Sequence, residues 1–117
     1  MPGEEDTMGL VTLDEAKDYL RVDYTEDDTL IGNLLSSSEN LCMDVARLSE
    51  EQWNEIIAGE VSSSVHTQDQ MNIIRETLRV AVLYTVAYLY EHRENANHNS
   101  LMLTLRALLF GIRKVRL

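Results

Sequence analysis

The sequence predicts an all-α fold of about five helices, in which two long helices and a C-terminal helix pack into a small bundle. The chain has 117 residues but only five Gly and one Pro, which favours few turns and long helices. Hydrophobic residues recur at helical spacing along most of its length. A chain of this size buries one core, so we predict a single helical domain over residues 12–117 after a flexible leader over residues 1–11.

Capping signals predict the first two helices. Thr12 and Glu15 have the spacing of a capping box, in which each side chain binds the other's free backbone N–H, so a short helix is expected over Leu13–Leu20. A second helix is expected to begin at Thr25 and to continue to about Val45. Three carboxylates in its predicted first turn suit the positive end of a helix dipole: Glu26, Asp27 and Asp28.

The middle of the chain predicts a short helix and then the longest one. Ser49 and Gln52 form a second capping box, which opens a short helix ending at Gly59. Thr67 and Gln70 open the longest helix in the same way. The second half of that helix, VAVLYTVAYLY, is apolar on every side, and its Val and Tyr residues also favour a buried strand. The unbroken helical spacing and the absence of Gly and Pro favour the helix.

The last predicted helix is capped by Asn99 or Ser100 and stops near Gly111. Its apolar stripe is Leu101, Leu105, Leu108 and Ile112, and a third side is also apolar: Leu103, Ala107 and Phe110. A helix that is hydrophobic nearly all round has to be buried nearly all round. The rest of the chain or another subunit are equally good candidates to cover it. A membrane surface is a weaker one, because the apolar residues wrap too far round for a two-faced helix.

Charge and cysteine content exclude several classes of function. The net charge is −10, which disfavours general binding to nucleic-acid phosphates. The charge is uneven, because residues 1–60 carry 16 acidic and 3 basic side chains, whereas residues 61–117 carry 4 acidic and 7 basic ones. Cys42 is the only cysteine, which excludes a disulfide framework or a thiolate metal cluster and suits a reducing cytoplasm.

Catalysis and DNA recognition are the function classes to weigh against a structural role. His66, His92 and His98 lie in predicted loops or helix ends without metal-ligand spacing, so we expect no enzyme, metal or cofactor. The stretch TLDEAKDYLRVDYTEDDTLI does have the pattern of a helix-turn-helix, which makes a small DNA-binding regulator the runner-up. Its recognition helix would present the carboxylates of residues 26–28 to the DNA phosphates, which would repel them.

Three stretches of the chain resemble the head-tail connector proteins that sit beneath the portal of tailed bacteriophages. They are VTLDEAKDYLRVDYTEDDTLIGNLLSSSENLCMDVAR at the start, IRETLRVAVLYTVAYLYEHRENA in the second half and LMLTLRALLFGIRKVRL at the end. The resemblance implies a structural virion protein of a phage or prophage, with no enzymatic activity and no cofactor. It also implies a ring of about twelve subunits that extends the DNA channel after packaging.

The partners implied by the resemblance are further copies of the chain, the portal protein and a tail-joining protein, without specific nucleic-acid or membrane binding. The implied location is the head–tail junction, and the bacterial host cytoplasm during assembly. The uneven charge predicts two opposed contact groups between subunits. The basic and apolar group is Arg106, Phe110, Ile112, Arg113, Lys114 and Arg116, and the acidic group is Glu26, Asp27 and Asp28. An adaptor that binds one protein partner as a monomer is a further alternative.

Overall fold

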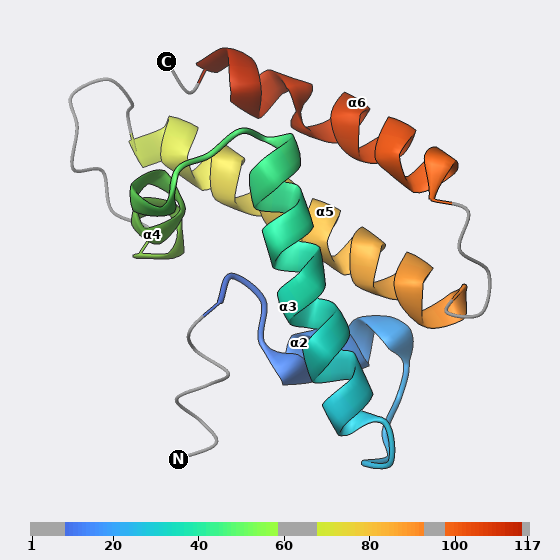
Figure 1. The fold of residues 1–117 in the computed structure, drawn as a ribbon. Coiled ribbons are helices and arrows are strands. Elements are labelled where there is room, and N and C mark those ends of the chain that lie inside the picture. Colours follow the sequence, from blue (N-terminus) through green and yellow to red (C-terminus); the bar gives the residue numbers. More distant parts are fainter. Residues whose placement is uncertain (1–8, 59–67, 93–97, 116–117) are drawn as a thin grey trace.

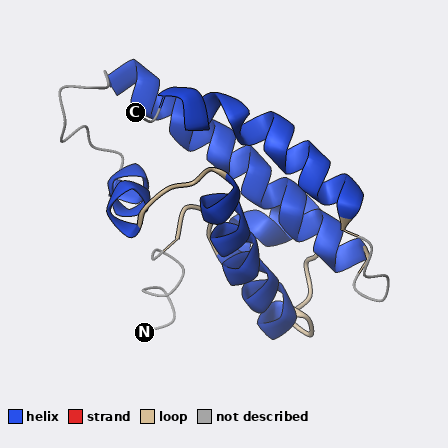
Figure 2. Ribbon diagram, turned by 45° about the horizontal axis from the view of Figure 1, so that its top comes forward, coloured by secondary structure: helices blue, strands red, loops and turns tan. Residues whose placement is uncertain are grey.

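The computed structural model describes residues 9–58, 68–92 and 98–115, and within these residues the regular secondary structure consists of five helices without a strand. The helices are α2 (Leu13–Leu20), α3 (Asp28–Val45), α4 (Glu50–Ala58), α5 (Gln68–Glu91) and α6 (Asn99–Val115). The predicted all-α fold is therefore confirmed (Figure 2). The stretch VAVLYTVAYLY lies inside α5, so the alternative of a buried strand is wrong.

The longest helix, α5, is the centre of the fold, and the other helices pack around it. Figure 1 shows α3 crossing in front of α5, and α6 running alongside α5 in the opposite direction. The short helix α2 packs against both α3 and α5, and α4 packs against the N-terminal half of α5. None of the helices in the described ranges combines the length and apolarity needed to cross a bilayer.

The core is formed where α3 and α6 meet α5. Five residues in the middle of α5 are fully buried: Leu78, Ala81, Val82, Thr85 and Val86. Ile31 and Cys42 of α3 are also fully buried, and the hydroxyl of the buried Ser38 has no hydrogen-bond partner in the described residues. Leu10 and Val11, from the segment predicted as a leader, are buried in the same core, so these two residues belong with the packed domain.

Both capping boxes that the described residues can test are confirmed. The Thr12 hydroxyl accepts a hydrogen bond from Glu15 N at 3.1 Å, and the Glu15 carboxylate accepts one from Thr12 N at 2.9 Å. In the same way, Ser49 N donates to Gln52 Oε1 at 2.9 Å and Gln52 N donates to Ser49 Oγ at 3.2 Å. Residues 59 and 67, where two further helix boundaries were predicted, lie outside the described residues.

Two predicted boundaries are wrong. The second helix begins at Asp28, with Asp27 as its N-cap residue, three positions after the predicted start at Thr25. The last helix passes through Gly111 to Val115, and the carbonyl of His98 accepts the first backbone hydrogen bond, from Met102 N. Gly111 lies on an exposed side of α6, and the helix continues through it. A glycine inside a helix costs only about 1 kcal/mol relative to Ala, so it does not have to end the helix.

The buried stripe of α6 also differs from the prediction. Leu101, Leu105 and Leu109 are buried, whereas Leu108 is only half-buried. The observed stripe contains Leu109 where the predicted one contained Leu108. The buried side of the helix is therefore rotated relative to the prediction, because successive residues are about 100° apart around the helix axis. Leu103 and Phe110 lie on the opposite side of the helix from this stripe, and both side chains are exposed, by 66% and 56% respectively.

Candidate assembly interface

The outer side of α6 is the first surface that the sequence analysis singled out. Leu103 and Phe110 lie seven residues apart and therefore on the same side of the helix, and Arg106 is exposed between them. Ala107 is exposed as well, so an apolar strip with one positive charge runs along the outside of α6. Exposed large apolar residues that share one helix side mark a protein-contact surface more often than isolated ones do.

Four of the nine predicted contact residues cannot be placed. Ile112, Arg113 and Lys114 belong to α6, but their side chains are not among those described, and Arg116 lies outside the described residues. Of the predicted basic and apolar group, the structure therefore places Arg106 and Phe110.

The predicted acidic group does not form one exposed cluster. Glu26 is exposed, but Asp27 accepts hydrogen bonds from the hydroxyls of Tyr90, at 2.5 Å, and Tyr24, at 3.3 Å. Asp28 Oδ1 lies 2.7 Å from Lys17 Nζ, which ties the start of α3 to α2. Two of the three carboxylates are thus engaged within the chain, and Glu26 is the one fully presented to a partner.

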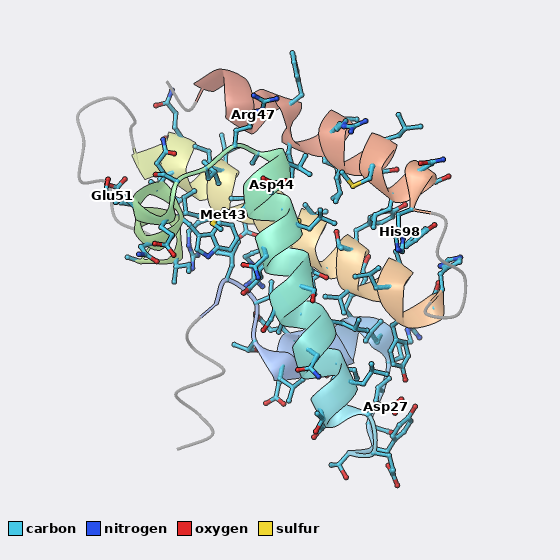
Figure 3. The ribbon with its side chains drawn as sticks, viewed as in Figure 1. Asp27, Met43, Asp44, Arg47, Glu51 and His98 are labelled. Atoms are coloured by element: carbon cyan, nitrogen blue, oxygen red, sulfur yellow. The ribbon has the colours of Figure 1, made fainter. Side chains whose placement is uncertain are left out.

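The Asp27 contacts explain why α3 starts later than predicted. Its carboxylate lies against tyrosine hydroxyls and makes no capping hydrogen bond to the helix. Asp27 also raises the pKa of Tyr90, because a nearby carboxylate that accepts the phenolic proton opposes its loss. This contact fixes the turn before α3 against the C-terminal end of α5 (Figure 3).

The acidic turn and the outer side of α6 lie at different ends of the molecule. Figure 3 shows Asp27 at the end of α3 that points away from α6, and the two regions do not meet within one chain. A contact between these two groups would therefore have to join different copies.

A second exposed apolar side lies on α5, and the sequence analysis missed it. Ile73 and Val80 are 66% and 55% exposed, and their spacing of seven residues puts them on one side of the helix. Tyr84, Ala87 and Glu91 continue this side at four, seven and eleven residues after Val80. This regular spacing could have indicated the exposed side of α5. Because the whole segment is apolar, however, the sequence did not distinguish its exposed positions from its buried ones.

A groove of about 640 Å³ opens next to this side of α5. It lies between the C-terminal end of α2 and the last turns of α5, and its lining consists of Tyr19, Leu20, Arg21, Tyr84, Ala87, Tyr88, Glu91 and His92. Its lining is about equally polar and apolar: three tyrosines and two aliphatic side chains supply apolar surface, and Arg21 and Glu91 supply one charge of each sign.

One arginine positions the α2 wall of this groove. Arg79 of α5 binds Glu15 of α2 through two contacts, Nη2 to Oε2 at 2.7 Å and Nη1 to Oε1 at 3.2 Å. Its Nη1 also donates to the carbonyl of Leu10 at 2.9 Å. The hydrogen bond from Arg79 is the main cause of the lowered pKa of Glu15. The segment before α2 is held from the other side by Glu39, whose carboxylate accepts hydrogen bonds from Leu10 N and Val11 N.

His92, His98 and Cys42, the histidines and the cysteine that the structure describes, form no recognisable catalytic arrangement. The ring of His92 stacks on Tyr88 at 4.3 Å, and the ring of His98 meets the same tyrosine edge-on at 6.2 Å. Among the described residues, no group of three or more His, Cys, Asp and Glu side chains is placed to hold a metal ion. Burial raises the pKa of the Cys42 thiol to about 11, so it stays protonated at neutral pH. His66 lies outside the described residues.

Comparison with known protein families shows the family to which the chain belongs. A family model described as "Phage gp6-like head-tail connector protein" matches residues 10–114, nearly the whole chain. The chain belongs to this family. The match begins at Leu10, the first buried residue of the described core. No curated protein and no solved structure matches the chain.

Membership of the head-tail connector family confirms the resemblance noted in the sequence. It gives this connector protein a structural role in joining the phage head to the tail, together with other head and tail proteins, and a place in the virion.

Proposed function

We propose that this connector protein assembles as a ring beneath the portal, extends the DNA channel and provides the platform to which tail-joining proteins bind. The ring would contain about twelve subunits, as expected from the family resemblance. It would occupy the head–tail junction in the virion and would form in the host cytoplasm. The exposed apolar side of α6 is the observation that carries this proposal, because a small subunit that functioned alone would gain nothing from leaving Leu103 and Phe110 in water.

The basic end of α6 and the acidic turn before α3 are proposed to face each other across the subunit boundary. Arg106, Phe110, Ile112, Arg113, Lys114 and Arg116 would lie on one side, and Glu26, Asp27 and Asp28 on the other. The internal contacts of Asp27 and Asp28 leave Glu26 as the principal acidic contact, with the other two adding to the local negative potential.

Charge reversal at the end of α6 tests this function. The double variant Arg113→Glu/Lys114→Glu is expected to keep its helicity and to lose assembly on the portal, measured by sedimentation of portal complexes and by electron microscopy. Arg47→Glu is the control, because Arg47 is exposed between α3 and α4 and belongs to neither proposed contact group. Full assembly of the double variant would contradict the proposed contact.

The alternative of a DNA-binding regulator is tested on the same protein. Binding to duplex DNA with a steep loss of affinity as salt increases would support the regulator, because a DNA reader releases counterions from the phosphates it contacts. A connector is expected to show no such binding.

A further inference from the structure

The chain carries two exposed apolar sides that face in different directions. One is the outer side of α6, with Leu103 and Phe110. The other is the side of α5 that begins at Val80 and continues into the groove beside α2. Thr85 of α5 contacts Cys42 of α3, and Val80, five residues earlier, lies about 140° away around the helix, so the side with Val80 faces away from α3. A protein with two different contact sides can bind copies of itself head to tail.

The two sides match in length and in shape. Leu103 and Phe110 are seven residues apart on α6, and Val80 and Ala87 are seven residues apart on α5, so each pair spans about 10 Å along its helix. The groove beside Ala87 is lined by Tyr19, Tyr84 and Tyr88 and measures about 640 Å³, which is more than enough for one aromatic side chain. The exposed Phe110 has the shape and chemistry to fill it.

Charge and the position of the groove together favour one relative direction of the two helices. Exposed residues around the C-terminal end of α5 are mostly acidic, with Asp23, Glu26 and Glu91 against Arg21. In the sequence, the C-terminal turns of α6 are basic. A parallel alignment brings these ends together and places Phe110, in the C-terminal half of α6, at the groove beside the last turns of α5.

We propose that α6 of one copy lies parallel to α5 of the next copy, with Leu103 beside Val80 and Phe110 in the groove at Ala87. The occupant is a second copy of this chain because both matching surfaces and both opposite charges occur on it. The contact is heterologous, so a pair of copies retains one unoccupied groove and one unoccupied α6 side, and repetition of the contact closes a ring when the rotation per subunit allows it. The inference rests on the proposed ring and names the surfaces that build it.

Disulfide trapping between separately prepared variants, each with one cysteine added to the native Cys42, tests this docking. Val80→Cys mixed with Leu103→Cys, and Ala87→Cys mixed with Phe110→Cys, are expected to form covalent dimers under mild oxidation of the full chain. The native Cys42 is fully buried and does not interfere. Asn40→Cys, exposed on α3, is the control and is expected to form no dimer with Phe110→Cys.

The opposite pairs, Val80→Cys with Phe110→Cys and Ala87→Cys with Leu103→Cys, would react in an antiparallel arrangement and would overturn the proposal. Dimers of Phe110→Cys with itself would also overturn it, because they indicate a symmetric contact between α6 helices. At about millimolar protein, covalent trapping accumulates even weak contacts, so the absence of all the predicted dimers overturns it as well.

The same experiment separates this inference from the proposed function. Rings seen by electron microscopy on the portal without the predicted disulfides would leave the ring standing and exclude this contact. The predicted disulfides in open chains that never close would support the contact and contradict the ring. For non-covalent association, Phe110→Ala is expected to weaken self-assembly at least about tenfold, because a central aromatic side chain in a groove is a typical hot spot.

Discussion

Replacing Arg79 tests whether one guanidinium holds α2 and the segment before it against α5. Arg79 makes two hydrogen bonds to Glu15 and one to the carbonyl of Leu10, which are 64 and 69 residues away in the sequence. Arg79→Ala removes all three. Arg79→Lys is the matched control, because it keeps the charge but loses the planar fork that binds both carboxylate oxygens.

The expected loss follows from the exposure of the pair. The Arg79 and Glu15 side chains are 24% and 40% exposed, so the pair lies between a fully exposed ion pair and a buried one. A fully exposed pair contributes at most about 1 kcal/mol, and breaking a buried pair costs about 3–5 kcal/mol. We take about 1.5 kcal/mol for the pair and about 1 kcal/mol for the hydrogen bond to Leu10. Arg79→Ala should then lower the free energy of unfolding by about 2.5 kcal/mol and Tm by about 10 °C.

Urea denaturation of four proteins measures the pairwise part: wild type, Arg79→Ala, Glu15→Gln and the double variant. The coupling energy between the two positions is expected to be about 1.5 kcal/mol. Acid adds a second measurement. Arg79 lowers the pKa of Glu15 below 4.5, so this stabilisation is present above that pH and is lost as the pH falls through the folded-state pKa. Wild type should therefore lose more stability than Arg79→Ala between pH 5 and pH 2.

A coupling energy below about 0.5 kcal/mol, with parallel acid curves for wild type and Arg79→Ala, would refute this reasoning. The pair would then behave like an ordinary surface salt bridge. In that case α2 would be held by its buried apolar contacts and the Lys17–Asp28 ion pair, and the α2 wall of the groove would not depend on Arg79.

Three further predictions, made with four substitutions, test the fold. Arg47 has a left-handed backbone with φ of 59°, a conformation that glycine adopts without steric cost. Arg47→Gly should therefore raise the free energy of unfolding by about 0.5–1 kcal/mol in urea denaturation. A lower free energy of unfolding would contradict the assigned conformation. Leu105→Ala should lower the free energy of unfolding by about 2–5 kcal/mol, because Leu105 is fully buried. Leu103→Ala should change it by less than about 0.5 kcal/mol, because Leu103 is exposed. Equal losses for the two variants would show that the buried side of α6 is misassigned. Tyr90→Phe removes the hydroxyl that donates to Asp27 and should lower Tm at pH 8. The pKa of Tyr90 is raised, so its stabilising effect is present below pH 10 and is lost as the pH rises through the folded-state pKa. Tm of the Phe variant should accordingly fall less steeply than that of wild type above pH 10, and identical alkaline profiles would contradict the contact.

Sequence reasoning succeeded where structure is decided locally. The capping boxes at Thr12 and Ser49 involve residues three positions apart, so their spacing was enough to locate α2 and α4. The apolar excess of the last helix was also visible, and the exposure of Leu103 and Phe110 agrees with the expectation that some of it would be left uncovered.

Sequence reasoning failed where distant residues decide the outcome. Tyr90, which is 63 residues from Asp27 in the chain, binds the carboxylate that was expected to belong to the first turn of α3. The choice between Leu108 and Leu109 on α6 depends on how that helix is rotated against α5, which its own sequence does not determine. The groove was equally inaccessible, because it exists only where the end of α2 meets the last turns of α5.

The double attachment of Leu10 has a consequence for the dynamics of the first residues. Its amide is bound by Glu39 and its carbonyl by Arg79, so the two ends of one residue are fastened to different helices. Solvent deuterium can replace the amide proton of Leu10 only after the Glu39 hydrogen bond breaks. In a hydrogen-exchange experiment this amide should therefore be protected as well as the helices it joins, and it becomes a single-residue reporter of whether α3 and α5 separate.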